Sequence, residues 1–358
     1  MTALYDSIRR RWRQLKEKEP WNGNAAMRIA YGVLCFCARI VKRMFSGTDL
    51  EARALYLYYH PELGIAPRDA WKDKSWRDIS HGELEKLRAQ LAADRERTCR
   101  ALGVAEAPLD DVQPLDEEPS GRVAIHLHAF YPDRLPVIAA AFMRIPFPFD
   151  LYVSAPEDGA VDEASVRRTM EPVPRLRTLV FRLCPNRGRD IAPLVCLFGR
   201  ELASYCYVAH FHTKKSPQDV VWRSWLDFTL ERLVGSDENC RRIFRLLSDG
   251  CGMVSASDFL KTAEDPSGWG ANLALAQDLL SRMGMNVDLA AMFPIIAFPQ
   301  GSMFWARTDF LRRLLELPLA FDDFPEEPVR SDGTLAHALE RLFYVWGLGT
   351  GLGVRRIP

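Results

Sequence analysis

Val123-Ala-Ile-His-Leu127 is the first of five short apolar segments that decide the predicted fold. The other four are Phe149-Asp-Leu-Tyr-Val-Ser154, residues 176–183, Tyr205-Cys-Tyr-Val-Ala-His-Phe-His212 and Met253-Val-Ser-Ala256. Their length and their β-branched and aromatic residues are typical of strands. Stretches with helical character separate them: residues 135–143, a segment that begins at Asp190, and residues 222–247. Strands that alternate with helices in this way predict an α/β fold with a mostly parallel sheet.

Polar segments follow several of these strands directly. In open α/β sheets, ligands bind beyond the carboxyl ends of the strands, so these segments are the first candidates for a functional site. They are His128-Ala-Phe-Tyr-Pro-Asp133, Asn186-Arg-Gly-Arg-Asp190, His212-Thr-Lys-Lys-Ser216 and Ser257-Asp258.

The segment from Asn186 to Asp190 is predicted to be a turn, because Gly188 can adopt positive φ and Asp190 can cap the following helix. Arg187 and Arg189 suit a phosphate or a ribose hydroxyl edge, since the guanidinium fork matches such oxygens. A capped turn with two solvated arginines is the alternative. Lys214 and Lys215 could likewise offset the charge of a diphosphate leaving group, or they are a solvated lysine pair.

Four histidines lie in two similar patterns, His126-Leu-His128 and His210-Phe-His212. Each pattern places two imidazoles on one face of a strand, and neighbouring strands would bring all four together. Zinc is one interpretation. Hydrogen-bonded buried histidines are the commoner one, and no cysteine or carboxylate spacing supports a metal.

Residues 331–343 predict a helix that Ser331 caps, with Asp332 in its first turn. A carboxylate at a helix start beside a cleft can act as a general base. The structural alternative is a first-turn acid stabilised by the helix dipole.

The whole chain has 358 residues, with 47 Lys and Arg against 47 Asp and Glu, and 48% hydrophobic residues. This composition indicates a globular protein with an ample core, and the balanced charge argues against a protein whose main task is nucleic-acid binding. Eight cysteines occur without any C-x-x-C pair. They are interpreted as buried hydrophobic residues in a reducing compartment, and no secretory signal is visible, which predicts a cytoplasmic protein.

The first 121 residues divide into three parts. Residues 1–48 are a basic amphipathic arm, in which residues 24–45 either lie on an anionic membrane surface at the inner face of the plasma membrane or pack on the rest of the protein. Residues 49–105 are predicted to be helical, with a capping box formed by Ser80 and Glu83. Residues 106–121 are an acidic linker that contains prolines, and residues 122–358 form the main domain.

Five segments together resemble the rhamnan synthesis protein F family over about residues 122–354. They are His128 to Tyr131, Asn186 to Asp190, His212 to Ser216, Phe298-Pro-Gln-Gly-Ser-Met-Phe-Trp-Ala-Arg307 and Asp332-Gly-Thr-Leu-Ala-His-Ala-Leu-Glu-Arg341. The resemblance implies a GT-A-like, nucleotide-sugar-binding α/β/α sandwich with an N-terminal helical extension. It also implies transfer of rhamnose or a related sugar to a lipid-linked cell-envelope polysaccharide. The alternative is a noncatalytic component that binds the glycan or its synthases.

The resemblance also suggests a role for each candidate residue. Asp332 is expected to be the catalytic base of an inverting reaction. Donor and diphosphate binding are expected at His128, Asn186, Arg187, Arg189, Asp190, His212, Lys214 and Lys215. Sugar or acceptor binding is expected at Asp258, Gln300, Ser302, Trp305, His337, Glu340 and Arg341. Many GT-A enzymes carry a D-x-D metal motif, but no acid lies between Tyr205 and Ser216, so no metal ligand or cofactor is predicted and a metal-independent reaction is favoured.

Overall fold

The computed structural model describes residues 81–213, 224–259, 268–329 and 332–358. The arm at residues 1–48, most of the predicted helical region, Lys214, Lys215 and Ser331 lie outside the described residues. Within the described part, no helix is both long and apolar enough to cross a membrane.

An eight-stranded sheet forms the centre of the domain, in the order β1-β8-β6-β7-β5-β2-β3-β4. The strands are β1 Val104–Glu106, β2 Val123–His128, β3 Phe149–Pro156, β4 Leu176–Cys184, β5 Tyr207–His212, β6 Cys251–Ala256, β7 Phe304–Arg307 and β8 Gly353–Ile357. All neighbouring pairs are parallel except those that β7 makes with β5 and β6.

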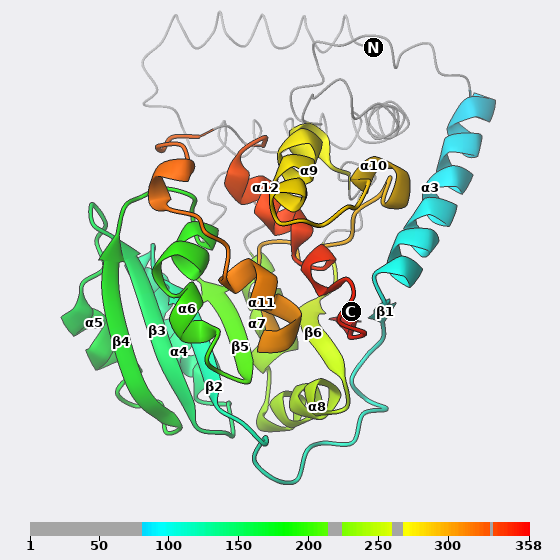
Figure 1. Cartoon of the computed structure of the whole chain (residues 1–358). Helices are drawn as coiled ribbons and strands as arrows, with labels where there is room; N and C mark the ends of the chain where they lie inside the picture. The colour runs from blue at the N-terminus through cyan, green and yellow to red at the C-terminus, as the bar shows by residue number, and fades with distance from the viewer. Residues whose placement is uncertain (1–80, 214–223, 260–267, 330–331) are drawn as a thin grey trace, which may run out of the picture.

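Helices cover both faces of the sheet (Figure 1). The α-helices are α3 His81–Ala101, α4 Leu135–Phe142, α5 Glu163–Met170, α6 Gly199–Leu202, α7 Trp225–Val234, α8 Asp237–Ser248, α9 Leu273–Arg282, α10 Leu289–Met292, α11 Thr308–Leu315 and α12 Leu335–Leu342. A π-helix spans Pro193–Leu197, and short 3₁₀ helices span Pro132–Arg134, Gly270–Asn272, Phe321–Asp323 and Val345–Gly347.

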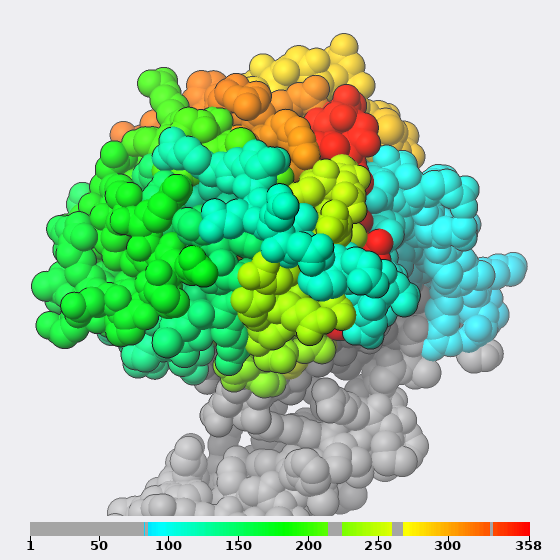
Figure 2. All heavy atoms as spheres, turned by 90° about the horizontal axis from the view of Figure 1, so that it is seen from below, coloured from blue at the N-terminus to red at the C-terminus, as the bar shows by residue number. Residues whose placement is uncertain are grey.

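The hydrophobic core has two halves, one on each face of the sheet. One half packs α6, α9, α11 and α12 against the sheet, and it includes the buried residues Phe198, Leu311 and Leu339. The other half packs α4, α5, α7 and α8 against the opposite face, with Phe142 and Phe244 at its centre. Figure 2 shows the molecule from below, where the segment that precedes β2 lies beside α8. The predicted α/β sandwich with an N-terminal helix is therefore confirmed.

All five predicted strands are present, within two residues of their expected ends. The sequence did not reveal β1, β7 or β8. β1 lies at the boundary between the predicted helical region and the linker, yet it pairs with β8 through Val104 and Val354 and belongs to the sheet. The single helix expected from Asp190 is wrong. In its place the chain forms the π-helix at Pro193–Leu197 and then the short helix α6.

The antiparallel strand β7 decides where the pocket forms. Because β7 runs opposite to β5 and β6, it begins at the edge where those strands end. The loop before β7 therefore lies where β5 and β6 end, at the edge where ligands bind in such sheets.

Candidate functional site

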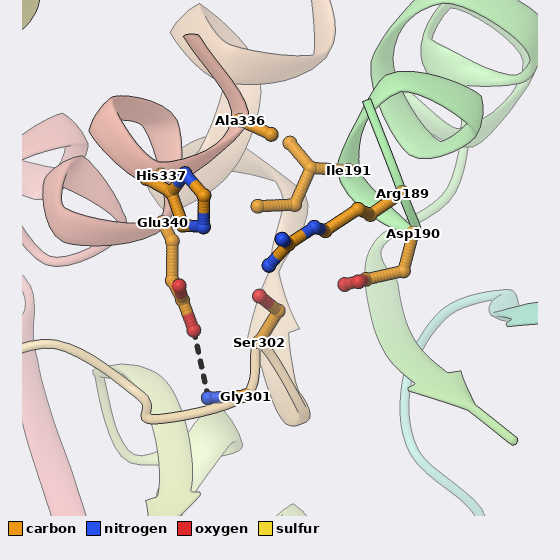
Figure 3. Close-up of a pocket in the computed structure, with 8 residues that line it drawn as sticks. All are labelled: Arg189, Asp190, Ile191, Gly301, Ser302, Ala336, His337 and Glu340. Atoms are coloured by element: carbon orange, nitrogen blue, oxygen red, sulfur yellow. Dashed lines mark hydrogen bonds between the residues drawn. The ribbon is translucent and has the colours of Figure 1, made fainter. Parts of the chain in front are cut away.

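A polar pocket lies at this edge of the sheet (Figure 3). It contains about 260 Å³ of empty space, including the part that opens to solvent. Its lining residues come from three separate segments: Arg189, Asp190, Ile191, Gly301, Ser302, Ala336, His337 and Glu340.

The turn from Asn186 to Asp190 supplies one wall of the pocket. Gly188 and Arg189 have φ values of 65° and 57°, so the predicted positive φ at Gly188 extends to a residue with a side chain. Arg187 forms ion pairs with Asp322 and Glu326, and Arg189 lies 3.8 Å from Glu327. Of the two predicted phosphate-binding arginines, Arg189 lines the pocket, whereas Arg187 ties the turn to the segment that follows α11.

The loop before β7 supplies the second wall. Ser302 has a φ of 64°. Among the described residues, Ser302 and Arg189 are the two non-glycine residues with positive φ. Such residues persist only where their surroundings fix them, and they cluster at functional sites. The Nε2 atom of His212 lies 2.6 Å from the carbonyl oxygen of Gly301, to which it donates a hydrogen bond, and the ring of His212 stacks on Trp225.

Helix α12 supplies the third wall. Thr334 is its N-cap residue, and His337 and Glu340 face the pocket one turn apart. The backbone N–H of Gly301 donates to Oε1 of Glu340 over 2.8 Å, so the helix and the loop before β7 hold each other in place. The Nδ1 atom of His337 lies 2.8 Å from Oγ1 of Thr334.

The sequence predicts Asp332 in the first turn of a helix. In the structure Asp332 lies in the loop before α12 instead. Its neighbour Gly333 has a φ of 78°, which a right-handed helix does not allow, and α12 begins at Leu335. The Asp332 carboxylate is buried and accepts hydrogen bonds from Ala271 N and Asn272 Nδ2. It also pairs with Arg341 over 3.1 Å, and it does not line the pocket.

Trp305 does not line a sugar pocket, contrary to the prediction. Its side chain is fully buried in β7 between Phe211 and Phe244, and its indole N–H donates to the carbonyl oxygen of Leu233. Trp305 is therefore a core residue.

The remaining predicted residues lie around the pocket or away from it. Asp258 pairs with the buried Arg356 over 2.6 Å at the end of β6. The Nδ2 atom of Asn186 lies 3.4 Å from Oδ2 of Asp158. Arg341 donates hydrogen bonds to the carbonyl oxygens of Gly268 and His337. Gln300 directly precedes the loop residues that line the pocket.

The two histidine pairs meet, as the sequence suggested. Strands β2 and β5 are parallel neighbours in a register that places His126 opposite His210 and His128 opposite His212. The Nδ1 atoms of His126 and His210 are 2.9 Å apart, and Nε2 of His210 is 3.2 Å from Oδ2 of Asp190 in the pocket. Among the described residues, no group of three or more His, Cys, Asp or Glu side chains is arranged to hold a metal ion.

Sequence reasoning missed Ser154, which completes this cluster. Its Oγ atom lies 2.9 Å from both Nε2 of His126 and Nδ1 of His128. A signal was present, because Ser154 ends the second predicted strand segment as His128 ends β2, and parallel register pairs the two positions. The other pocket residues that it missed, Ile191, Gly301 and Ala336, contribute backbone or apolar surface.

Burial keeps the central imidazoles neutral. It lowers the pKa of His126 well below the usual value, and the neighbouring His210 and His128 lower it further. It also lowers the pKa of His128 to about 4, although the charge of Asp190 opposes the shift.

An α/β sandwich with a polar pocket at the carboxyl ends of its strands is a ligand-binding architecture. The chain belongs to the rhamnan synthesis protein F family, which matches residues 104–348. This match covers most of the sheet and all three walls of the pocket.

Two curated relatives are similar to part of the chain. Both are proteins named WxcX and described as uncharacterised, from two strains of Xanthomonas campestris pv. campestris. Each is 33% identical over 158 residues, which is 44% of this chain and 22% of the relative. The match thus spans about a fifth of the length of these relatives.

A solved structure, the mannosyltransferase Ktr4p from S. cerevisiae, shares 10% identity with the chain. The alignment covers 72% of each chain with a TM-score of 0.33.

Replacement of Gly188 by alanine should disrupt the turn that carries Arg189. The new Cβ would lie 2.4 Å from Cβ of Ala192 and 2.5 Å from the ring of Phe324, besides the cost of positive φ. Gly284→Ala is the matched control, because Gly284 has a φ of 69° and nothing lies within 4 Å of the added Cβ. In urea denaturation we expect Gly188→Ala to cost at least about 1 kcal/mol more than Gly284→Ala. Equal losses would show that the turn accommodates a side chain.

The neutral histidines should make the folded state sensitive to acid. A folded pKa below the unfolded value means that the unfolded chain binds more protons, so stability is full above about pH 6.5 and falls as the pH drops toward 4. For His128 alone, we expect a loss of about 2 kcal/mol between pH 7 and pH 5, measured by urea denaturation. His128→Gln, which cannot titrate, should flatten this dependence. An unchanged slope in that variant would contradict the assignment.

Proposed function

We propose that this chain is a glycosyltransferase that transfers rhamnose or a related sugar from a nucleotide-sugar donor to a lipid-linked cell-envelope polysaccharide. The observation that carries the proposal is the convergence of Arg189, Asp190, His337 and Glu340 in one pocket, in a chain of the rhamnan synthesis protein F family. Carboxylates and an imidazole suit sugar hydroxyls, and a guanidinium suits a phosphate oxygen.

The reaction is proposed to be a direct displacement with inversion, in a GT-A-like plan. The acceptor oxygen forms a bond to the anomeric carbon while the bond from that carbon to the diphosphate breaks, and its electron pair leaves with the diphosphate. A base removes the proton of the acceptor hydroxyl. We assign the developing charge on the diphosphate to Arg189, which lines the pocket, and to Lys214 and Lys215, which the sequence predicts as further cations.

Two assignments of the base compete. The sequence pointed to Asp332, which is buried outside the pocket and already accepts from two nitrogen donors besides its ion pair with Arg341. Glu340 lines the pocket from α12. A base must reach the proton that it removes, so we propose Glu340 for this role and Asp332 as the residue that fixes the loop before α12.

The proposed function is tested by product analysis. The full chain is incubated with a panel of nucleotide sugars and lipid-linked acceptors, and the products are identified by mass spectrometry and NMR. Calorimetric titration with nucleoside diphosphates separates the enzyme from the noncatalytic alternative, because a scaffold that binds only glycans or synthases should bind none. Absence of both binding and product across the panel would contradict the proposal. A cytoplasmic location, with residues 24–45 in contact with the inner face of the plasma membrane, is part of the same proposal.

The variants Glu340→Gln and Asp332→Asn compare the two bases in one chain. We expect Glu340→Gln to lower turnover by about 100-fold or more and to leave nucleotide affinity nearly unchanged. Asp332→Asn should mainly lower the free energy of unfolding, by about 1–3 kcal/mol, because Arg341 loses its buried charged partner. Turnover is measured at saturating substrate, and unfolding by urea. The reverse pattern would assign the base to Asp332.

The metal-independent form of the reaction is tested with a chelator. If lysines rather than a divalent ion offset the diphosphate charge, EDTA should leave turnover unchanged. Replacement of Lys214 and Lys215 together by alanine should then lower turnover by about 30-fold, which corresponds to about 2 kcal/mol. Loss of activity in EDTA that Mg²⁺ or Mn²⁺ restores would show that the reaction depends on a metal.

A further inference from the structure

Five buried side chains form a continuous hydrogen-bonded chain from His128, at the end of β2, to the pocket. From the pocket outward, Asp190 Oδ2 meets His210 Nε2 at 3.2 Å, and His210 Nδ1 meets His126 Nδ1 at 2.9 Å. His126 Nε2 then meets Ser154 Oγ at 2.9 Å, and Ser154 Oγ meets His128 Nδ1 at 2.9 Å. The strands β5, β2 and β3 contribute all members except Asp190, so the sheet itself fixes their order.

The protonation of its two ends determines the direction of the hydrogen bonds in this chain. An ionised carboxylate can only accept, so Nε2 of His210 carries a proton, and in the neutral form of this ring Nδ1 must then accept. The Nδ1 atom of His126 is then the donor, and its Nε2 atom accepts from the Ser154 hydroxyl. Ser154 in turn accepts from Nδ1 of His128. With Asp190 ionised and His210 neutral, every donor therefore points toward the pocket, whereas a proton donated by Asp190 to His210 reverses the whole chain.

We propose that His210, His126 and Ser154 are positioning residues that hold Asp190 in the pocket as an ionised acceptor for a hydroxyl group of the bound sugar nucleotide. Only the identity of this ligand rests on the proposed function. The Asp190 carboxylate points into the pocket beside Arg189 and Ser302 (Figure 3), where it can receive such a hydroxyl.

The position of Asp190 favours its ionised form. A buried carboxylate is costly unless polar partners face it, and Oδ2 of Asp190 lies 3.2 Å from Nε2 of His210 and lines the pocket beside Arg189. Among the described residues, the titratable groups that bond to Asp190 or line the pocket with it are Arg189 of its own turn, His210 of β5 and, across the pocket, His337 and Glu340 of α12. The depressed pKa values of His126 and His128 match the neutral rings that the chain requires in either direction.

The first test reads the tautomers directly in the unaltered chain. Two-bond ¹H–¹⁵N NMR spectra of the imidazoles distinguish a proton on Nδ1 from one on Nε2. We expect the Nδ1–H form for His126 and His128 and the Nε2–H form for His210 at pH 7. The opposite forms, with the proton of His126 on Nε2 and that of His210 on Nδ1, would mean a protonated Asp190 and overturn the proposal. This readout requires no activity, so it stands even if the proposed function fails.

The second test breaks the chain two links away from the pocket. Ser154→Ala removes the donor to His126, so Asp190 should become easier to protonate, and the acidic limb of the pH profile of kcat/KM should move up by about half a pH unit or more. Ser154→Thr restores a hydroxyl and should restore the profile. The matched control is Ser255→Ala, which removes a buried strand hydroxyl bonded to Tyr344, away from the chain, and should leave the limb in place. Equal profiles for Ser154→Ala and Ser255→Ala would show that the chain does not act on Asp190.

Discussion

The site depends on one constraint, the burial of the imidazole rings of His126, His128 and His210 on the central strands β2 and β5. Each ring nitrogen that loses water must find a partner, and His126, His210 and Ser154 find theirs across β5, β2 and β3. A shift of any one of these strands by a single residue would turn its polar side chains to the opposite face. The hydrogen bonds thus fix the strand register, and the register in turn fixes Asp190 relative to the sheet.

The pocket follows from this frame and from two strained turns. Arg189 and Ser302 both adopt positive φ, and their turns face each other across the pocket because β7 runs against its neighbours. The contact between Gly301 N and Glu340 joins the loop before β7 to α12. A parallel β7 would begin at the far edge of the sheet and leave the pocket without its second wall.

Much of the fold could be predicted from the sequence because five strands carry strong local patterns. β1 and β7 have three and four residues, too few for such a pattern, and the family resemblance assigns Trp305 of β7 to the pocket lining. The candidate site was predicted in part, since Arg189, Asp190, Ser302, His337 and Glu340 do meet. The positions of Asp332 and Trp305 depend on the φ of Gly333 and on the direction in which β7 runs, and spacing along the chain reveals neither.

The charge of the pocket limits what the site can hold without help. Arg189 faces two carboxylates in the lining, Asp190 and Glu340, and Glu327 lies nearby. A diphosphate would add further negative charge, and Coulomb repulsion at such distances is large in a partly buried site. The described walls therefore suit the sugar portion of a donor better than its diphosphate. The diphosphate needs additional cations, and His212-Thr-Lys-Lys-Ser216 is where the sequence offers them. His212 is bonded to the pocket loop, and the two lysines follow two and three residues later in the chain. This separation of sugar and diphosphate agrees with the proposal that Asp190 is an ionised acceptor for a sugar hydroxyl, because a diphosphate beside an ionised Asp190 would be repelled.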